Sequence, residues 1–322
     1  MLGTIRDRAR RRVLTTSYPA MPETTPPLYR GTPLLDPAHC TGCADCADVC
    51  PSGAIEVERG AADAWSWRLD LACCVGCGAC AEACPTGALA ISRAFELAAR
   101  SREDLLTHVS VRAERGTSAV AVDAGVGGRR EGRDPSSRPL LGMTEAGEQL
   151  RRRIASLFRS SLHVRHLDLG SSNAEDWELT ATLNPIYDLQ RFGIDFVASP
   201  RHADMLVVTG AVTRNLAPAL WHTYEATPDP KLVVALGTDA CSGGVWGASY
   251  ATAGGVDRCV PVDVYIPGDP PRPQAIVHGL LLALDRREQK VRAGSAIATS
   301  SESGRWAQPP RPGERAAGEP RP

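Results

Sequence analysis

Eight of the eleven cysteines fall into one pattern that occurs twice. Each copy reads Cys-x2-Cys-x2-Cys-x3-Cys-Pro, and the second copy follows the first at an offset of 34 residues. The first copy comprises Cys40, Cys43, Cys46, Cys50 and Pro51, and the second comprises Cys74, Cys77, Cys80, Cys84 and Pro85. A chain that gathers so many thiols within about 45 residues is restricted to tight loops in a small, internally repeated unit.

The spacing suits two [4Fe–4S] clusters. Two residues between cysteines let one loop present three thiolates to a cube of iron and sulfide, which prefers sulfur donors. The fourth cysteine stands apart before a proline and serves the other cube. We therefore assign Cys40, Cys43, Cys46 and Cys84 to cluster 1, and Cys74, Cys77, Cys80 and Cys50 to cluster 2.

Small residues lie between these ligands and let backbone N–H groups approach the sulfurs. They are Gly42, Ala44, Gly76, Gly78 and Ala79. The alternative is a pair of zinc sites or a disulfide framework, but no histidine stands at ligand spacing and zinc sites rarely use a crossed fourth cysteine. Cys73 is not needed as a ligand, and we expect a packed or free thiol there.

Length and composition limit the other possibilities. The 322 residues suggest two domains. A net charge of −1 and 5% aromatic residues give no electrostatic or stacking basis for nucleic-acid binding. Reduced thiols indicate the cytoplasm, and no apolar run reaches the ~20 residues of a membrane span. The basic start of the chain is a solvated arm or lies on a membrane or partner surface.

We expect five segments along the chain. These are an extended N-terminal arm at 1–30, an α+β ferredoxin-like domain at 31–115, a flexible linker at 116–147, an α/β domain at 148–288 and a disordered tail at 289–322. Within the ferredoxin-like domain the patterns predict strands over 55–58, 64–70 and 89–92 and a helix over 93–110.

The second half alternates strand-like and helix-like segments, which is typical of an α/β sandwich. Two of its strand candidates, DMLVVTG and KLVVALG, are continuous apolar runs that suit a mostly parallel sheet buried on both faces. Residues 147–161 form a basic amphipathic helix, either docked on its own domain or facing a membrane or partner.

Several stretches carry a resemblance to known subunits. The segments SLHVRHLDLGSSN, SPRHADMLVVTGAVTRN and PVDVYIPGDPPRP resemble the small subunit of formate hydrogenlyase-type membrane-bound [NiFe] hydrogenases, a homologue of the complex I B-subunit. The first half resembles the two-cluster ferredoxin subunit of the same complexes. The resemblance covers about 15–110 and 148–287 and implies a fusion of two subunits, the second flavodoxin-like.

The resemblance also implies partners and a location. We expect a hydrogenase- or complex I-like large subunit, membrane subunits and an external electron donor or acceptor protein. The chain would then be cytoplasmic and peripheral, held on the inner face of the cell membrane through its partners.

The resemblance further implies a third, proximal cluster with four cysteines, but this chain departs from that pattern. The corresponding positions are Ser172, Glu175, Asp239 and Asp269. Oxygen donors disfavour iron and sulfide, and the two other thiols, Cys241 and Cys259, cannot complete a four-thiolate site. We therefore expect the third cluster to be absent.

Two alternatives stay open for these carboxylates. The first is a vestigial cavity of salt bridges and water, with neutralising groups from neighbouring loops. The candidate neutralising residues are Arg201, His202, Arg214 and Arg272. The second is a hard cation such as Mg²⁺ or Ca²⁺ held by Glu175, Asp239 and Asp269.

No catalytic residue is expected in this chain. It has no P-loop and no dinucleotide fingerprint, so any turnover belongs to a partner. The first hypothesis is an electron-transfer subunit of a membrane-associated hydrogenase- or complex I-like oxidoreductase. The second is a structural or redox-sensing scaffold subunit without through-going electron transfer. A weaker third is a soluble ferredoxin with an appended inert domain.

Overall fold

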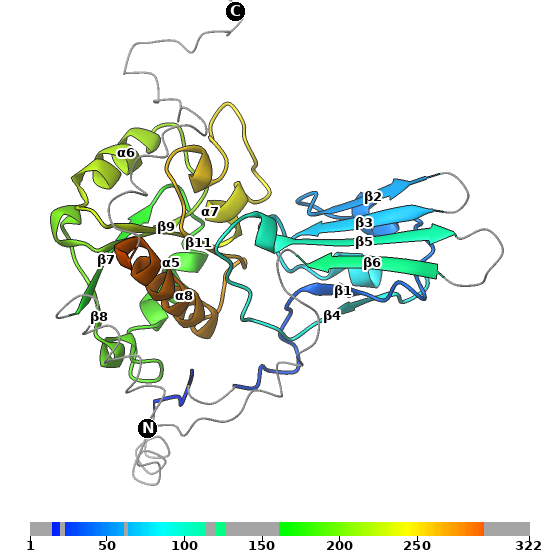
Figure 1. Ribbon diagram of the computed structural model, residues 1–322, viewed down its shortest axis with the longest axis horizontal. Coiled ribbons are helices and arrows are strands. Elements are labelled where there is room, and N and C mark those ends of the chain that lie inside the picture. Colours follow the sequence, from blue (N-terminus) through cyan, green and yellow to red (C-terminus); the bar gives the residue numbers. More distant parts are fainter. Residues whose placement is uncertain (1–14, 20–22, 61–63, 114–119, 127–160, 293–322) are drawn as a thin grey trace, which may run out of the picture.

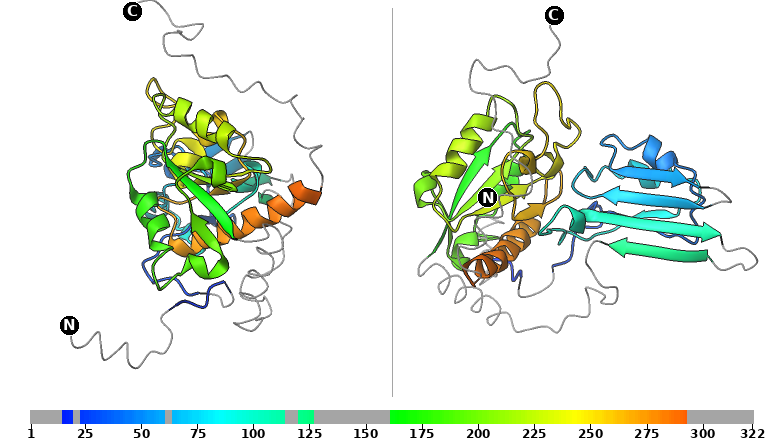
Figure 2. Two further views of the ribbon diagram at one scale, coloured as in Figure 1. Left: turned by 90° about the vertical axis from the view of Figure 1, so that its left-hand side faces the viewer. Right: turned by 45° about the horizontal axis from the view of Figure 1, so that its top comes forward.

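The computed structural model describes residues 15–19, 23–60, 64–113, 120–126 and 161–292. They form two bodies that lie side by side, a cysteine-rich domain and an α/β domain (Figures 1 and 2). The structure contradicts the first residues of the expected disordered tail, 289–292, which are helical. Four expectations fall on the remaining residues: most of the N-terminal arm, most of the linker, the basic amphipathic helix and the tail beyond residue 292. These lie outside the described residues.

The cysteine-rich domain has ferredoxin-like α+β architecture, as expected. Its short strands β1 (Pro33–Leu35) and β4 (Leu89–Ile91) pair antiparallel, and its two helical turns are α2 (Asp45–Asp48) and α3 (Ala79–Glu82). A four-stranded antiparallel sheet runs in the order β2 (Ile55–Arg59), β3 (Trp65–Asp70), β5 (Leu106–Ala113) and β6 (Val120–Val126). The predicted strands over 55–58, 64–70 and 89–92 are confirmed.

Alternation along β3 builds the core of this domain. Trp65, Trp67 and Leu69 are buried on one face, whereas Arg68 is exposed on the other. Val109 of β5 joins these side chains, since β3 and β5 are paired in register. The same core contains Cys46 and Cys80, so the sheet packs directly against the cysteine loops.

Two expectations about the end of this domain are wrong. Residues 93–110 do not form a helix: the chain is irregular up to a 3-10 turn, η1 (Glu103–Leu105), and then enters β5. The apparent helical period arose because Phe95, Ala98 and Leu105 are buried against the α/β domain, one after another along a non-helical chain. Strand β6 occupies residues 120–126, which we expected to belong to the flexible linker.

The α/β domain contains a five-stranded sheet in which every neighbouring pair is parallel. The order is β11 (Val264–Ile266), β10 (Leu232–Leu236), β9 (Met205–Thr209), β7 (Leu162–Asp168) and β8 (Ile194–Phe196). Every residue of β9 and β10 is buried, which agrees with their continuous apolar sequence.

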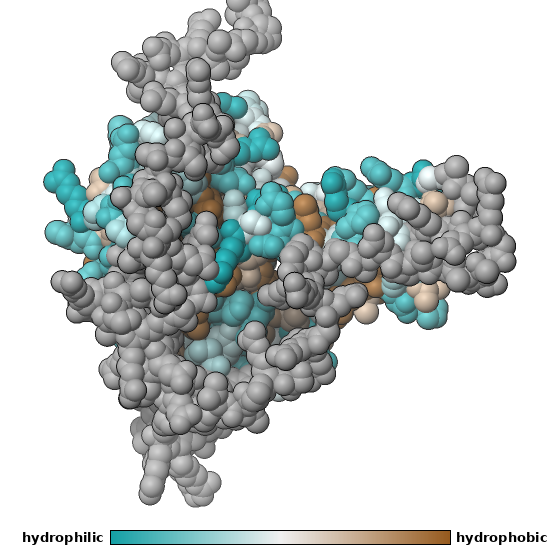
Figure 3. Space-filling view, in the orientation of Figure 1, coloured by the Kyte–Doolittle hydropathy of each residue, from teal (hydrophilic) through white to brown (hydrophobic). Residues whose placement is uncertain are grey.

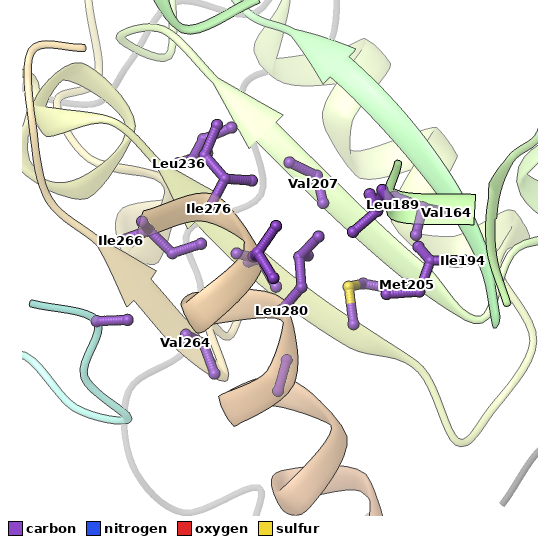
Figure 4. Packing of buried hydrophobic residues seen from close by; sticks show 14 of the residues in the cluster. Val164, Leu189, Ile194, Met205, Val207, Leu236, Val264, Ile266, Ile276 and Leu280 are labelled. Atoms are coloured by element: carbon purple, nitrogen blue, oxygen red, sulfur yellow. The ribbon is translucent and has the colours of Figure 1, made fainter. Parts of the chain in front are cut away.

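Helices cover both faces of this sheet. They are α5 (Ala174–Ala181), α6 (Ala217–Ala226), α7 (Thr238–Ser242) and α8 (Pro273–Arg292), with 3-10 turns η3 (Leu189–Phe192), η4 (Pro200–His202) and η5 (Val256–Arg258). On one face Ile276 and Leu280 of α8 pack over Val207 and Leu236 (Figure 4). On the other face lie α6 and the short α7, an element that the sequence patterns did not predict. Among the described helices, none combines the length and hydropathy that a membrane-spanning segment requires.

The cysteine-rich domain completes the second face of the sheet. Ala72, Ala99 and Leu105 belong to the same buried cluster as Leu206 and Val233. Ala99 also pairs with Tyr265 of the edge strand β11: each backbone N–H donates to the other residue's carbonyl, at 2.9 and 2.8 Å. Hydrophobic residues are visible where the two domains meet (Figure 3). The two domains therefore share this buried cluster, besides the separate core around Trp67.

Candidate metal centres

The first cavity is surrounded by the four cysteines that we assigned to cluster 1. Cys40, Cys43, Cys46 and Cys84 line this cavity. Its remaining walls are largely apolar and include Trp65 and Trp67. Two distant parts of the chain therefore meet here, because α2 and α3 lie side by side.

The second cavity is surrounded by the other four cysteines. Cys50, Cys74, Cys77 and Cys80 line this cavity, together with Ile55 and Ile91 among others. The structure thus brings together the two crossed sets that the spacing predicts. That these thiols ligate iron stays a prediction.

The loops have the backbone conformation that such sites require. Gly42 and Ala44 in the first loop have φ values of 65° and 72°, and Gly76 and Gly78 in the second have 65° and 82°. This conformation turns backbone N–H groups inward: the N–H of Gly42 points at Cys40 Sγ (3.4 Å). The N–H of Ala54 likewise donates to Cys50 Sγ (3.3 Å).

The donor set fits iron–sulfur clusters rather than single ions. Within the part of the chain that the structure describes, no group of three or more His, Cys, Asp or Glu side chains could hold a metal ion. In a cubane cluster each thiolate binds a different iron, so the four sulfurs stand further apart than the ligands of one zinc. Burial raises the pKa of Cys46, Cys74 and Cys80 to about 11, so thiolates at these positions need a metal beside them.

Helix α7 of the α/β domain contacts the second cysteine loop directly. Thr238 Oγ1 donates a hydrogen bond to the carbonyl of Cys74 (3.1 Å), and Ser242 Oγ donates one to the carbonyl of Ala72 (2.8 Å). A cleft lies at the same junction, with Cys74 in one wall and Asp269 in another. The second cavity is therefore the one attached to the α/β domain, a contact that no sequence motif indicated.

Cys73 lies at this junction without lining either cysteine cavity. Its thiol donates to Asp70 Oδ2 (3.4 Å), and the same carboxylate is held by Arg102 at 2.8 Å. This placement agrees with the packed thiol that we expected.

The positions that would hold a third cluster lie at the carboxyl ends of the parallel strands. Glu175 is fully buried in the first turn of α5, and Asp239 in α7 is 7% exposed. Asp269 follows β11 and is exposed, and so is Ser172 in the loop before α5. The three carboxyl groups interact electrostatically, because Asp239 and Asp269 both raise the pKa of Glu175. No thiol replaces them, since Cys241 is buried with its Sγ directed at Ala235 O (3.6 Å).

Gly237 allows this close packing. It has φ of +91°, and a Cβ at this position would lie 2.5 Å from Glu175 Cγ. The carboxyl side chain therefore rests directly on the backbone between β10 and α7.

The predicted neutralising cations do not pair with these carboxyls. Arg214 donates to Ser249 O (3.0 Å), while Arg272 donates to Gln274 Oε1 (2.7 Å) and lies over the ring of Phe95 (5.0 Å). Arg201 and His202 are exposed in η4. Both carboxyl oxygens of Glu175 are buried without a hydrogen-bond partner.

For the described residues, both alternatives for these carboxyls stay predictions. None of the ion pairs there involves Glu175, Asp239 or Asp269. In the same residues no group of three or more His, Cys, Asp or Glu side chains is arranged to hold a metal ion.

A polar network beside Glu175 was missed from the sequence. Asp176 Oδ1 lies 3.0 Å from His166 Nε2 and accepts a hydrogen bond from Thr209 Oγ1 (2.7 Å). Its other oxygen accepts one from Ser171 Oγ (3.1 Å). The sequence shows two adjacent acidic residues at 175–176, which could have pointed to this network. Only the fold shows that Asp176 has hydrogen-bond partners and that the Glu175 carboxyl oxygens have none.

Two family patterns match the chain. The "4Fe-4S dicluster domain" matches residues 39–88, and "NADH ubiquinone oxidoreductase, 20 Kd subunit" matches residues 173–283. The fold and the cysteine loops thus define an iron–sulfur protein that combines a dicluster domain with a domain of the NADH ubiquinone oxidoreductase 20 kDa subunit type.

Similar proteins agree on the second half. The chain is 45% identical over 148 residues to the probable membrane-bound hydrogenase subunit mbhJ of Pyrococcus furiosus, covering 45% of this chain and 89% of that protein. It is 40% identical to formate hydrogenlyase subunit 7 of Escherichia coli, covering 50% and 64%. For the B-type subunit of the NADH-quinone oxidoreductase of Citrifermentans bemidjiense the identity is 50%, over 34% and 64%.

The chain belongs to the NADH ubiquinone oxidoreductase 20 kDa subunit family, preceded by a 4Fe-4S dicluster domain. It spans less than two thirds of the last two relatives. Among solved structures it is similar to a chain of an archaeal membrane-bound sulfane sulfur reductase. That match has 32% identity and a TM-score of 0.37, over 44% of this chain and 76% of that one.

Proposed function

We propose that this chain is an electron-transfer subunit of a membrane-associated hydrogenase- or complex I-like oxidoreductase, with two [4Fe–4S] clusters and no third. Bound at the eight cysteines, such clusters supply one-electron carriers. The chain's own residues hold them in apolar cavities, keep the second cavity against α7 and offer no further thiol set in the α/β domain.

The observation that carries this proposal is the attachment of the second cysteine loop to α7. Thr238 and Ser242 fix the backbone of Cys74 and Ala72 at 3.1 and 2.8 Å. Helix α7 also carries Asp239, one of the replaced positions. An electron leaving the second site toward the α/β domain would meet carboxyl groups, so we infer that electrons exchange with a partner at the cysteine-rich domain.

The proposed partners are a large subunit, membrane subunits and an external donor or acceptor protein. Exposed aromatic residues follow the carboxyl ends of the strands: Trp177 is 74% exposed, Trp246 68% and Tyr250 94%. Large exposed apolar side chains of this kind mark interaction surfaces. We assign this surface to the large subunit, which would hold the chain at the inner face of the cell membrane.

We propose domain limits of 31–126 and 161–288 from the extent of the two sheets and the elements packed on them. The first limit differs from our expectation because β6 extends the antiparallel sheet. The shared core around Ala72 and Ala99 indicates that the two domains act as one unit.

Iron analysis and spin-resonance spectroscopy of the full chain test the proposal. Two cubes predict roughly eight irons per chain, and three predict roughly twelve. Reduced protein should show two interacting paramagnets that reoxidise reversibly and deliver electrons to the isolated complex. Roughly twelve irons, or centres that never cycle, would exclude the proposal.

A second candidate is a scaffold or redox-sensing subunit without through-going electron transfer. The carboxyl groups at the third position favour it, because they interrupt the usual series of metal sites. The discriminating measurement is electron delivery to the purified partner complex. Centres that cycle but deliver nothing would favour the scaffold.

A further inference from the structure

Glu175 is a buried acid with no visible compensation. It is 0% exposed, and neither carboxyl oxygen has a hydrogen-bond partner. An ionised carboxylate in such a place is costly unless it is paired. The carboxyl group must therefore be neutralised, or favourable interactions must offset the free-energy cost of burying its charge.

The charged groups around Glu175 are mainly negative. Asp239 of α7, Asp269 after β11 and the adjacent Asp176 all raise its proton affinity. On its own helix, Glu178 interacts with Arg272, which is engaged by Gln274 and by aromatic rings. On β7, His166 lies against Asp176 rather than Glu175. None of the ion pairs among the described residues joins a cation to Glu175.

Larger compensating groups do not fit. A metal ion would need further ligands in place, and the described residues contain no suitable group. A basic side chain from a partner subunit could not reach an acid whose oxygens are both sealed from the surface. Gly237 closes the space against its Cγ. A proton is the neutralising species that requires no space.

We propose that Glu175 is a proton-binding site that stands where the third cluster would be, with Asp239 and Asp269 strengthening its hold on the proton. A role of this site in electron transfer rests on the proposed function, because Glu175 packs against Gly237 at the start of α7 and α7 contacts the second cysteine loop. The protonation itself does not depend on that function.

The surrounding electrostatics agree with this assignment. Burial first, and then Asp239, Asp269 and Asp176, raise the pKa of Glu175 to about 7. Burial and Asp269 raise the pKa of Asp239 to about 6. The backbone N–H of Glu175 itself opposes this rise in pKa but does not cancel it. The site can therefore take up and release a proton near neutral pH.

Infrared difference spectra of the full chain between about pH 5 and about pH 9 test the proposal. The wild type should show the carbonyl band of a buried protonated carboxyl, lost with a midpoint near neutral pH. Glu175→Gln should lose the component of this band with a midpoint near pH 7, whereas a component from Asp239 with a midpoint near pH 6 should remain. Asp239→Asn should keep the band and move its midpoint to lower pH by roughly one unit. The control Glu225→Gln, exposed on α6, should leave the band unchanged.

A redox titration provides the second readout. If one proton from solvent binds Glu175 for each electron accepted at the second cysteine site, its potential falls by up to about 59 mV for each tenfold drop in proton concentration. Glu175→Gln should flatten this slope. A component with a midpoint near pH 7 that survives in Glu175→Gln, or a wild-type midpoint at the pH of a solvated glutamate, overturns the proposal. Absence of reversible centres alone counts against the proposed function, while the infrared result still decides the protonation.

Discussion

Thr238 Oγ1 donates a hydrogen bond of 3.1 Å to the carbonyl of Cys74, and this bond joins a helix of one domain to a cysteine loop of the other. The hydroxyl also accepts from the N–H of Gly268 at 3.3 Å. One side chain therefore fixes the cysteine loop and the loop that carries Asp269 relative to each other. A displacement at either loop is passed to the other through this hydroxyl.

Thr238→Val should weaken the junction without removing iron. The valine keeps the volume but leaves the Cys74 carbonyl without this donor, which costs about 1 kcal/mol of unfolding free energy. Denaturant unfolding and iron analysis check this. Thr223→Val on α6 is the matched control, because its hydroxyl bonds only within its own helix, to Ala219 O (2.8 Å). Equal effects of the two variants would contradict the role of Thr238.

The crossed cysteine sets make a prediction about double variants. Cys50→Ser and Cys77→Ser should each reduce the iron content from roughly eight to roughly four, because both line the second cavity. Together they should remove no more than either alone. Cys50→Ser with Cys40→Ser should remove nearly all the iron, although these residues are closer in sequence. Cys73→Ser should keep the full content, and the reverse pattern would refute the assignment.

Stability should depend on pH through Glu175. Its folded pKa of about 7 lies above the solution value of 4.5, so the folded chain binds more protons between these pH values. The stability that the protonated form provides is complete below about pH 4.5 and is lost as pH rises through about 7. Glu175→Gln should match the wild type at about pH 4.5 and exceed it at about pH 8 by on the order of 3 kcal/mol.

Thermal or denaturant unfolding at a series of pH values measures this difference. Asp239 adds to the same trend in the wild type, because its pKa is raised from 3.8 to about 6. Glu225→Gln controls for the loss of a surface charge. A stability difference that does not vary with pH would contradict the prediction.

Gly237→Ala should disturb the α/β domain more than a glycine substitution elsewhere. A Cβ there would lie 2.5 Å from Glu175 Cγ, in a backbone conformation with φ of +91°. Gly53→Ala is the matched control, because its φ is +61° and no atom lies within 4 Å of the added Cβ. We expect about 1 kcal/mol for Gly53→Ala from backbone strain alone and a larger loss for Gly237→Ala. Unfolding free energies of both variants decide the point.

The exposed aromatic residues predict a docking defect. Trp177→Ala and Trp246→Ala should lower the amount of large subunit that co-purifies with the chain, because buried tryptophans dominate interface energies. Iron content should not change. Leu28→Ala is a control at another exposed apolar position, where the side chain is 92% exposed. Unchanged co-purification would place the partner on another surface.

The strongest sequence signals were those that repeat or alternate. The doubled cysteine spacing anticipated which thiols meet, although the members of each set come from opposite halves of the repeat. The apolar runs of β9 and β10 anticipated a parallel sheet, since side chains covered on both faces leave no polar alternation. These features depend on local pattern alone.

The failures concern contacts between distant segments. The prediction of a helix over 93–110 was wrong because the backbone here pairs with two different partners. Ala99 pairs with Tyr265, and Val109 pairs with strand β3. Arg214 and Arg272, which we expected to neutralise the carboxyls, donate instead to Ser249 O and Gln274 Oε1. Proximity of loops at a sheet end does not determine which side chains meet.

The backbone pairing of Ala99 with Tyr265 has a consequence for how this protein came to be one chain. The cysteine-rich half supplies a piece of backbone that caps the edge of the other half's sheet, so the two would recognise each other even as separate polypeptides. Severing the connection between residues 126 and 161 should leave a nicked protein whose fragments stay associated. The covalent fusion then guarantees equal numbers of the two halves, and affinity between them comes from the surfaces themselves.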